Sequence, residues 1–244
     1  ELFTQHRTNC CSKLMLCKWR KNLVKKIKAT TLGKKAVMTN EDLQAYLEGD
    51  FKQSVIDFNN RCGKGVTDQH SCTQVLQLVI NQNKVVIEEC LESLTAFQER
   101  NTTERLDGLI DVYVTKTMLD EFMNALDKFS DEEITEASLN FSEDDLLTLQ
   151  IVPQLLNPAL IAAQGINLFT SKRFYINAEL ILENNRMKYT DDYDKMLTWK
   201  DSMKESSQIK TTTIDGKDWY CIILTETGKI QKPFDFVPVT LDLH

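Results

Sequence analysis

The sequence predicts an α+β fold, in which an antiparallel helical bundle precedes a small antiparallel β region. Apolar residues recur at helical spacing across much of residues 41–165. Farther on, the β-rich runs IKTTTI and KDWYCIIL flank Asp215-Gly216, a pair typical of a tight hairpin turn. The 244 residues are 42% hydrophobic and 27% charged, which is ordinary globular composition. We therefore expect a basic arm at 1–40, a helical bundle at 41–165, and a β-rich region with one helix at 166–244.

Basic side chains dominate the arm. Ten Lys or Arg residues and one acid give residues 1–40 a net charge of +9, so the remainder carries −16 of the chain's total of −7. Leu16, Trp19 and Leu23 fall at helical spacing, which predicts an amphipathic helix. The candidate anion-binding side chains are Lys18, Arg20, Lys21, Lys25, Lys26 and Lys28. Residues 13–35 would bind anionic lipid or nucleic-acid phosphate; the alternative is a solvated helix without a specific partner.

Capping signals and apolar spacing place the helices of the bundle. One helix is expected to begin at Asn40 and to continue to about residue 60. After a loop, a seam of residues spaced by three and four predicts the next helix. Its members are Leu76, Ile80, Asn83, Ile87, Cys90, Leu94 and Phe97. We expect Asn83, the polar member, to be partly exposed. A further apolar pattern begins at Leu106.

Two later helices are expected to begin at the capping sequences that follow Ser130 and Ser142. Pro153 and Pro158 are then expected to break the chain before a short apolar helix at 159–164. The apolar stretch around these residues contains Asn, Pro and Gln, which argues against a transmembrane span.

Alternating apolar residues predict a strand from Phe174 to Leu182, and residues 183–185 a turn. A helix is expected near residues 191–205, capped by Asp191 and Asp192. After the hairpin at Asp215-Gly216, residues 229–241 are expected to supply one or two more strands.

Seven cysteines leave at least one thiol unpaired within a single chain. Cys62 with Cys72, and Cys10 with Cys17, are candidate disulfides, which would imply an oxidising compartment. The alternative is that all seven are reduced. The chain begins at Glu1 rather than Met, from which we expect processing upstream. These features favour an extracytoplasmic or secreted protein.

The sequence contains no specific catalytic, metal or cofactor motif. His70 beside Cys72 lacks the surroundings of a nucleophilic pair, and neither Cys62, His70 and Cys72 nor the cysteines near His6 have zinc-site spacing. The acids at 191–194 lack the remainder of a calcium loop. No catalytic residue, metal site or cofactor is therefore assigned.

Three functions fit these observations. The first is a non-enzymatic protein that binds another protein through its helical faces and β region. The second is a peripheral binder of an anionic surface through the arm. The third is an enzyme with dispersed residues on the β region, where Asp218, Trp219 and Tyr220 would line a pocket.

Overall fold

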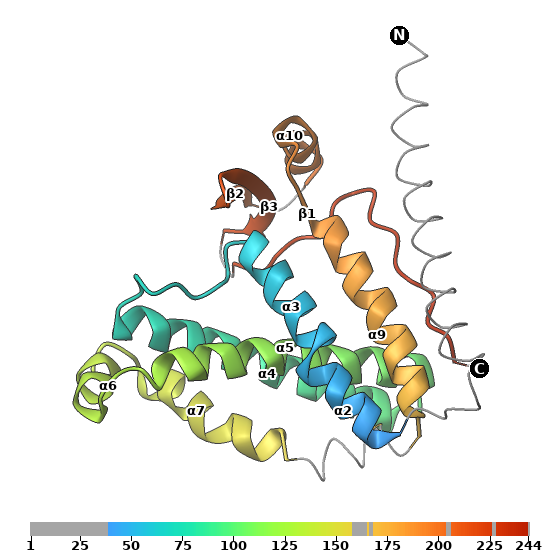
Figure 1. Ribbon diagram of the computed structural model, residues 1–244, viewed down its shortest axis with the longest axis horizontal. Coiled ribbons are helices and arrows are strands. Elements are labelled where there is room, and N and C mark those ends of the chain that lie inside the picture. Colours follow the sequence, from blue (N-terminus) through green and yellow to red (C-terminus); the bar gives the residue numbers. More distant parts are fainter. Residues whose placement is uncertain (1–38, 158–164, 166–167, 204–205, 226–227, 244) are drawn as a thin grey trace. The chain divides into compact units, whose positions relative to one another are not determined.

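The computed structural model describes residues 39–157, 165, 168–203, 206–225 and 228–243. The chain divides into two units, residues 1–39 and Asn40–His244, and the elements named below belong to the second. Helices dominate this unit, and a three-stranded antiparallel sheet lies toward its C-terminal end (Figure 1). The predicted α+β fold is confirmed.

Two long helices form the centre of the unit. α4 (Cys72–Gln98) begins at a capping box, in which the side chains of Ser71 and Gln74 each accept a backbone N–H of the other residue. α5 (Thr102–Leu126) packs antiparallel against α4. A Cβ atom added to Gly108 of α5 would lie 3.2 Å from the Cα of Ser93, so the two backbones approach closely there.

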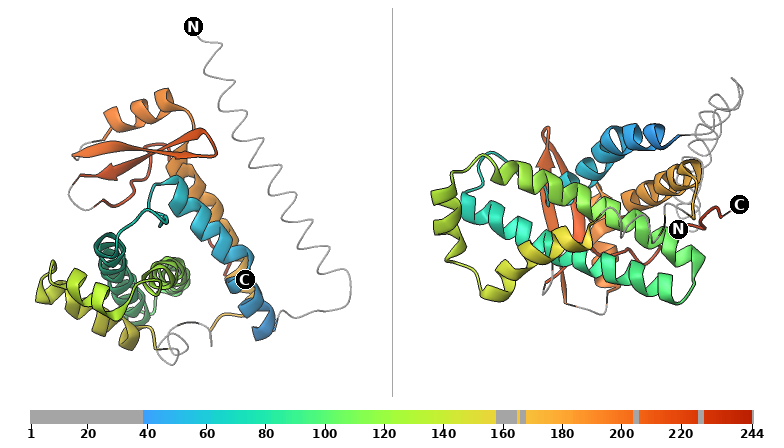
Figure 2. Two further views of the ribbon diagram at one scale, coloured as in Figure 1. Left: turned by 60° about the vertical axis from the view of Figure 1, so that its left-hand side comes forward. Right: turned by 90° about the horizontal axis from the view of Figure 1, so that it is seen from below.

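The other helices pack on either side of this central pair (Figure 2). α6 (Asp131–Ser138) and α7 (Glu143–Leu155) contact α4. α3 (Asp50–Arg61) and α9 (Ser171–Asn185) contact α5, and α2 (Asn40–Glu48) packs beside them. One continuous hydrophobic core results, with large, fully buried side chains that include Phe51, Leu76, Ile80, Leu106, Leu109 and Ile110.

The predicted caps at Ser130 and Ser142 are confirmed, but three details of the helical prediction are wrong. Ser130 and Ser142 accept N–H groups at the starts of α6 and α7. The helix expected from Asn40 to about residue 60 is interrupted at Gly49, which precedes the first residue of α3. Pro153 lies inside the last turn of α7, where it costs one hydrogen bond without ending the helix. Asn83 is buried rather than partly exposed. The helix expected at 159–164 lies outside the described residues.

The strand expected from Phe174 to Leu182 is wrong, because these residues belong to α9. Thr170 caps the helix by accepting the N–H of Arg173. The buried positions follow a helical period: Ser171, Phe174, Asn177, Ala178, Ile181, Leu182 and Asn185. Three of the seven are polar, so the spacing of apolar residues alone did not reveal the helical period.

The sheet is built around the expected hairpin. β2 (Ser207–Ile214) pairs with β3 (Lys217–Leu224) along eight residues without a bulge. Asp215 and Gly216 both have positive φ, 52° and 74°, as a type I′ turn requires. β1 (Tyr189–Thr190) follows the 3₁₀ turn η2 (Arg186–Lys188) and pairs with the other side of β3. The strand order is β1-β3-β2.

Helices cover both faces of this sheet (Figure 2). α10 (Tyr193–Asp201) is the expected helix, and Asp192 caps it by accepting the N–H of Lys195. It packs on one face through a small core of Met196, Trp199 and Ile222. The C-terminal end of α3 meets the other face, where Arg61 lies over the ring of Trp219 at 4.2 Å.

Residues 228–243, the C-terminal segment, form no named strand, so the strands expected at 229–241 are wrong. A single bridge joins Ile230 to Ile223 of β3. Farther on, the fully buried Asn177 holds the segment against α9: its amide donates to the carbonyl of Asp242 at 2.8 Å and accepts the N–H of Asp242 at 2.6 Å. Pro233 and Pro238 interrupt ladder hydrogen bonding, which favours this extended path over a strand.

Candidate functional site

The candidate anion-binding residues, from Lys18 to Lys28, lie outside the described residues, as do Cys10 and Cys17. Their roles stay predictions. Among the described residues, no helix is both long enough and apolar enough to cross a membrane.

The expected disulfide between Cys62 and Cys72 does not form, since both thiols are free. Cys62 follows the last residue of α3 and is buried, whereas Cys72 begins α4 beyond a loop. The neighbour of Cys62 is Cys221 of β3, whose thiol donates to the Cys62 carbonyl at 3.6 Å. The interaction with Cys221 and burial raise the pKa of Cys62, which keeps this thiol protonated. Sequence spacing alone could not identify this neighbour.

The residues considered for an enzyme on the β region are engaged in structural contacts. Trp219 stacks with Arg61 and meets the ring of Tyr189 edge-on. Tyr220 packs against Tyr193, and Asp218 accepts a hydrogen bond from Thr213 at 2.5 Å. These contacts account for the three side chains without a substrate.

The histidine considered for catalysis or zinc holds its own loop. His70 Nδ1 accepts the N–H of Thr67 at 2.9 Å. Within the described part of the chain, no three His, Cys, Asp or Glu side chains are grouped so as to hold a metal ion.

One edge of the sheet carries no partner among the described residues. β1 and residues 229–231 lie along the outer side of β3, where Leu224 N donates to Lys229 O and Gln231 N donates to Ile222 O. β2 forms the opposite edge, and within the described part of the chain it pairs with β3 alone. The sequence predicted this hairpin, but nothing local to it revealed which strand would lie at an edge.

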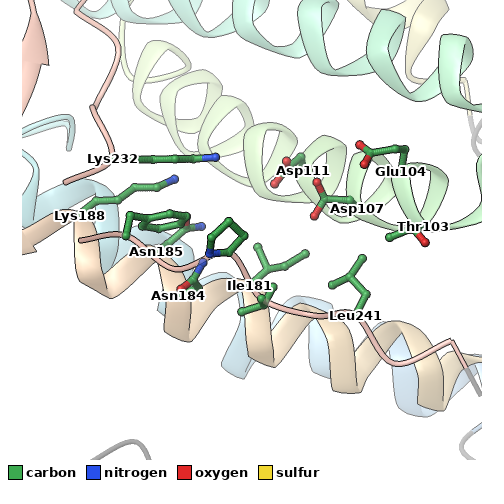
Figure 3. Close-up of a pocket in the computed structure, with 13 residues that line it drawn as sticks. Thr103, Glu104, Asp107, Asp111, Ile181, Asn184, Asn185, Lys188, Lys232 and Leu241 are labelled. Atoms are coloured by element: carbon green, nitrogen blue, oxygen red, sulfur yellow. The ribbon is translucent and has the colours of Figure 1, made fainter. Parts of the chain in front are cut away.

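A polar cavity of about 230 Å³ lies between α5, the end of α9 and the C-terminal segment (Figure 3). Glu104, Asp107 and Asp111 face it from α5, because helical residues three and four apart share a face. Lys188 of η2 and Lys232 of the C-terminal segment extend toward these acids. The apolar wall of the cavity consists of Ile181, Phe236, Pro238, Val239 and Leu241.

Burial dominates the electrostatics of this cavity. It raises the pKa of Asp111 to about 8, with further contributions from the carboxylates of Asp107 and Glu89. Burial also raises the pKa of Glu89 to about 7, and it lowers the pKa of Lys188. The spacing of the three acids on α5 was visible in the sequence. The two lysines were not, because they join the acids only through tertiary packing.

Family models, curated proteins and solved structures give no match to this chain. The proposals that follow therefore rest on the sequence and the geometry of this chain.

Proposed function

We propose that this chain is a non-enzymatic binding protein that takes up an extended segment of a partner protein along the outer edge of β2. The observation that carries the proposal is the length and regularity of this edge. It runs for eight residues without a bulge or proline. Protein edges of this kind are normally shortened, bulged or charged, because they pair readily with other strands.

Hairpin geometry identifies the groups available for pairing. The residues that flank a two-residue turn form a hydrogen-bonded pair, and such pairs alternate with outward-facing ones along an antiparallel ladder. Ile214 and Lys217 flank this turn, so Thr212 and Lys210 also direct their backbone groups toward β3. The backbone N–H and C=O groups of Ile209, Thr211 and Thr213 therefore point outward.

β2 packs against other parts of the chain on both of its faces, so its outer edge is held in an extended conformation before a partner binds. Ile209 lies against the small core under α10. On the other face, the Lys210 ammonium donates to the carbonyl of Gly63 at 2.6 Å, so this charge is directed to the loop after α3. A strand held on both faces loses little further freedom on binding, which favours affinity.

The side chains along the edge indicate the chemistry of the partner. Lys210 is the only charged residue in SQIKTTTI, and three consecutive threonines follow it. β-branched and hydroxyl side chains pair best with similar residues across a ladder. The expected partner segment is extended, uncharged and rich in β-branched or hydroxyl residues.

The experiment compares Thr211→Pro with Thr211→Val. A phage library of random ten-residue peptides is selected on the full chain, and selected peptides are synthesised and titrated by fluorescence anisotropy. Proline removes an outward N–H and leaves the pairing with β3 intact, whereas valine keeps that N–H and the β-branched shape. We expect binding to weaken at least about tenfold in Thr211→Pro and to change less than about twofold in Thr211→Val.

Hydrogen exchange then locates the bound peptide. The amides of Ile209, Thr211 and Thr213 should exchange more slowly in its presence. A selection that yields no binding peptide contradicts the proposal. So do peptides that bind Thr211→Pro as tightly as the unaltered chain.

The charge of the arm supports a second function, binding to an anionic surface. Neutralising Lys21, Lys25, Lys26 and Lys28 should abolish salt-sensitive binding to phosphatidylserine vesicles or to duplex DNA. Binding that is unchanged in this variant, or insensitive to salt, would remove this function.

A further inference from the structure

Carboxyl and ammonium groups face one another across the polar cavity without meeting. Asp107 and Asp111 line it from α5, and Lys188 and Lys232 line it from the other side (Figure 3). Among the described residues, no ion pair or hydrogen bond joins any of these four ionisable groups to a protein partner. The lysines instead contact aromatic rings, Lys188 that of Phe58 and both that of Phe236. Asp107, Asp111 and Lys188 are partly buried, whereas Lys232 is exposed. Partly buried charges are ordinarily paired, because removing them from water is costly.

The arrangement differs from a metal site. Carboxylates that hold a cation converge on one point, and no such group of three occurs in the described part of the chain. Here carboxylates and ammonium groups occupy different sides of one cavity. Such an arrangement suits a molecule that carries both charges at a fixed separation.

The size and the remaining wall restrict that molecule further. A cavity of about 230 Å³ lies just below the usual range for drug-sized ligands. Ile181, Val239 and Leu241 supply an apolar surface beside the charged groups. A compact carbon skeleton would therefore pack against this surface beside the charged groups.

We propose that this cavity binds a small zwitterion of the α-amino-acid class. Its ammonium group is received by Asp107 and Asp111, its carboxylate by Lys188 and Lys232, and its side chain by the apolar wall. The C-terminal segment contributes both Lys232 and part of the apolar wall, so binding also fixes this segment against α9.

The proposal predicts a characteristic pH dependence. Asp111 is surrounded by Asp107 and Glu104 on its own helix, by Glu89 on α4, by Lys188 on η2 and by Lys232 on the C-terminal segment. Because the pKa of Asp111 is about 8, this carboxyl is protonated at neutral pH when the cavity is empty. An entering ammonium group displaces that proton, so affinity should rise as the pH increases from 6 to 8.

The test titrates each of the twenty L-amino acids into the full chain by calorimetry at pH 8. We expect at least one to bind with a Kd below about 1 mM. Propylamine and propionate, which carry one charge each, should bind at least about tenfold more weakly. Asp111→Asn and Lys188→Gln should each weaken binding at least about tenfold. Asp120→Asn is the matched control, since Asp120 lies on the same helix but pairs with Lys116 on the surface.

Three results would overturn the proposal. One is saturable binding by none of the amino acids up to 10 mM. Another is affinity that Asp111→Asn and Lys188→Gln leave unchanged, and a third is equal affinity for the singly charged compounds. Proton release provides an independent check. The unaltered chain should release protons on binding at pH 7, in an amount that depends on Asp111 and disappears in Asp111→Asn.

Discussion

The substitution Asn177→Ala should release the C-terminal segment from α9. Asn177 is fully buried, and its amide group makes both hydrogen bonds that a backbone partner would make with Asp242. The same amide nitrogen also donates to the carbonyl of Arg173 at 2.8 Å. Alanine keeps the helix and removes all three interactions.

The expected loss follows from these contacts. Each net hydrogen bond contributes about 1 kcal/mol, so the two bonds to Asp242 contribute about 2 kcal/mol. Val239, Leu241 and Leu243 pack against the main core and lose part of this packing when the segment is released. A total loss of about 2–3 kcal/mol should lower Tm by about 5–10 °C in a domain of this size.

Thermal unfolding and hydrogen exchange measure this effect together. The amide of Asp242 should exchange quickly in Asn177→Ala, while the core amides of α4 and α5 keep their protection. Asn81→Ala is the control, because Asn81 accepts its hydrogen bond from Gln77 on an exposed surface of α4; it should change stability by less than about 0.5 kcal/mol. Equal Tm values for the two variants, with the Asp242 amide still protected, would refute the reasoning.

Three further substitutions test other parts of the structure. Gly216→Ala should lose about 1–2 kcal/mol in chemical denaturation, because Gly216 has a φ of 74° and nothing lies within 4 Å of an added Cβ, so that only backbone strain is introduced. Gly108→Val should lower stability by more than about 2 kcal/mol, since its side chain would meet the backbone of Ser93, and unchanged unfolding would show that α4 and α5 can separate there. For Asp111, the raised folded pKa means that the folded state binds a proton more tightly than the unfolded state, so stability is lost as the pH rises from about 4 to 8. Asp111→Asn lacks this loss, and its Tm relative to the unaltered chain should be higher at pH 8.5 than at pH 5.

Local signals predicted much of the fold. Ser130 and Ser142 indicated two helix starts, and the seam that includes Leu76 and Ile80 indicated α4. Asp215-Gly216 indicated the hairpin, because few residue pairs accept two consecutive positive φ angles. In each case the deciding interaction lies within a few residues along the chain.

The failures have an equally physical cause. Asn177 and Asn185 are buried in α9, although the predicted strand and turn gave neither a place in the core. Asn177 is satisfied by a segment 65 residues away. Pro153 was expected to break the helix, as proline does in a helix interior, whereas it lies in the last turn of α7. The proposed pairing of Cys62 with Cys72 relied on closeness in sequence, although the neighbouring thiol is on β3.

The polar cavity could be anticipated only in part. Glu104, Asp107 and Asp111 were not predicted as site residues, although their spacing puts them on one helical face. Lys188 and Lys232 come from segments brought there by the packing of α9 and the C-terminal segment. Those contacts are long-range, and single-sequence periodicity carries no information about them.

The way in which Asn177 holds the C-terminal segment has an evolutionary consequence. Its amide recognises only the main-chain N–H and C=O of residue 242, groups that every amino acid except proline provides. A substitution at position 242 other than proline therefore keeps these two hydrogen bonds, whereas mutation at position 177 removes both. Selection for these two hydrogen bonds should therefore retain Asn177, and at position 242 it should exclude only proline.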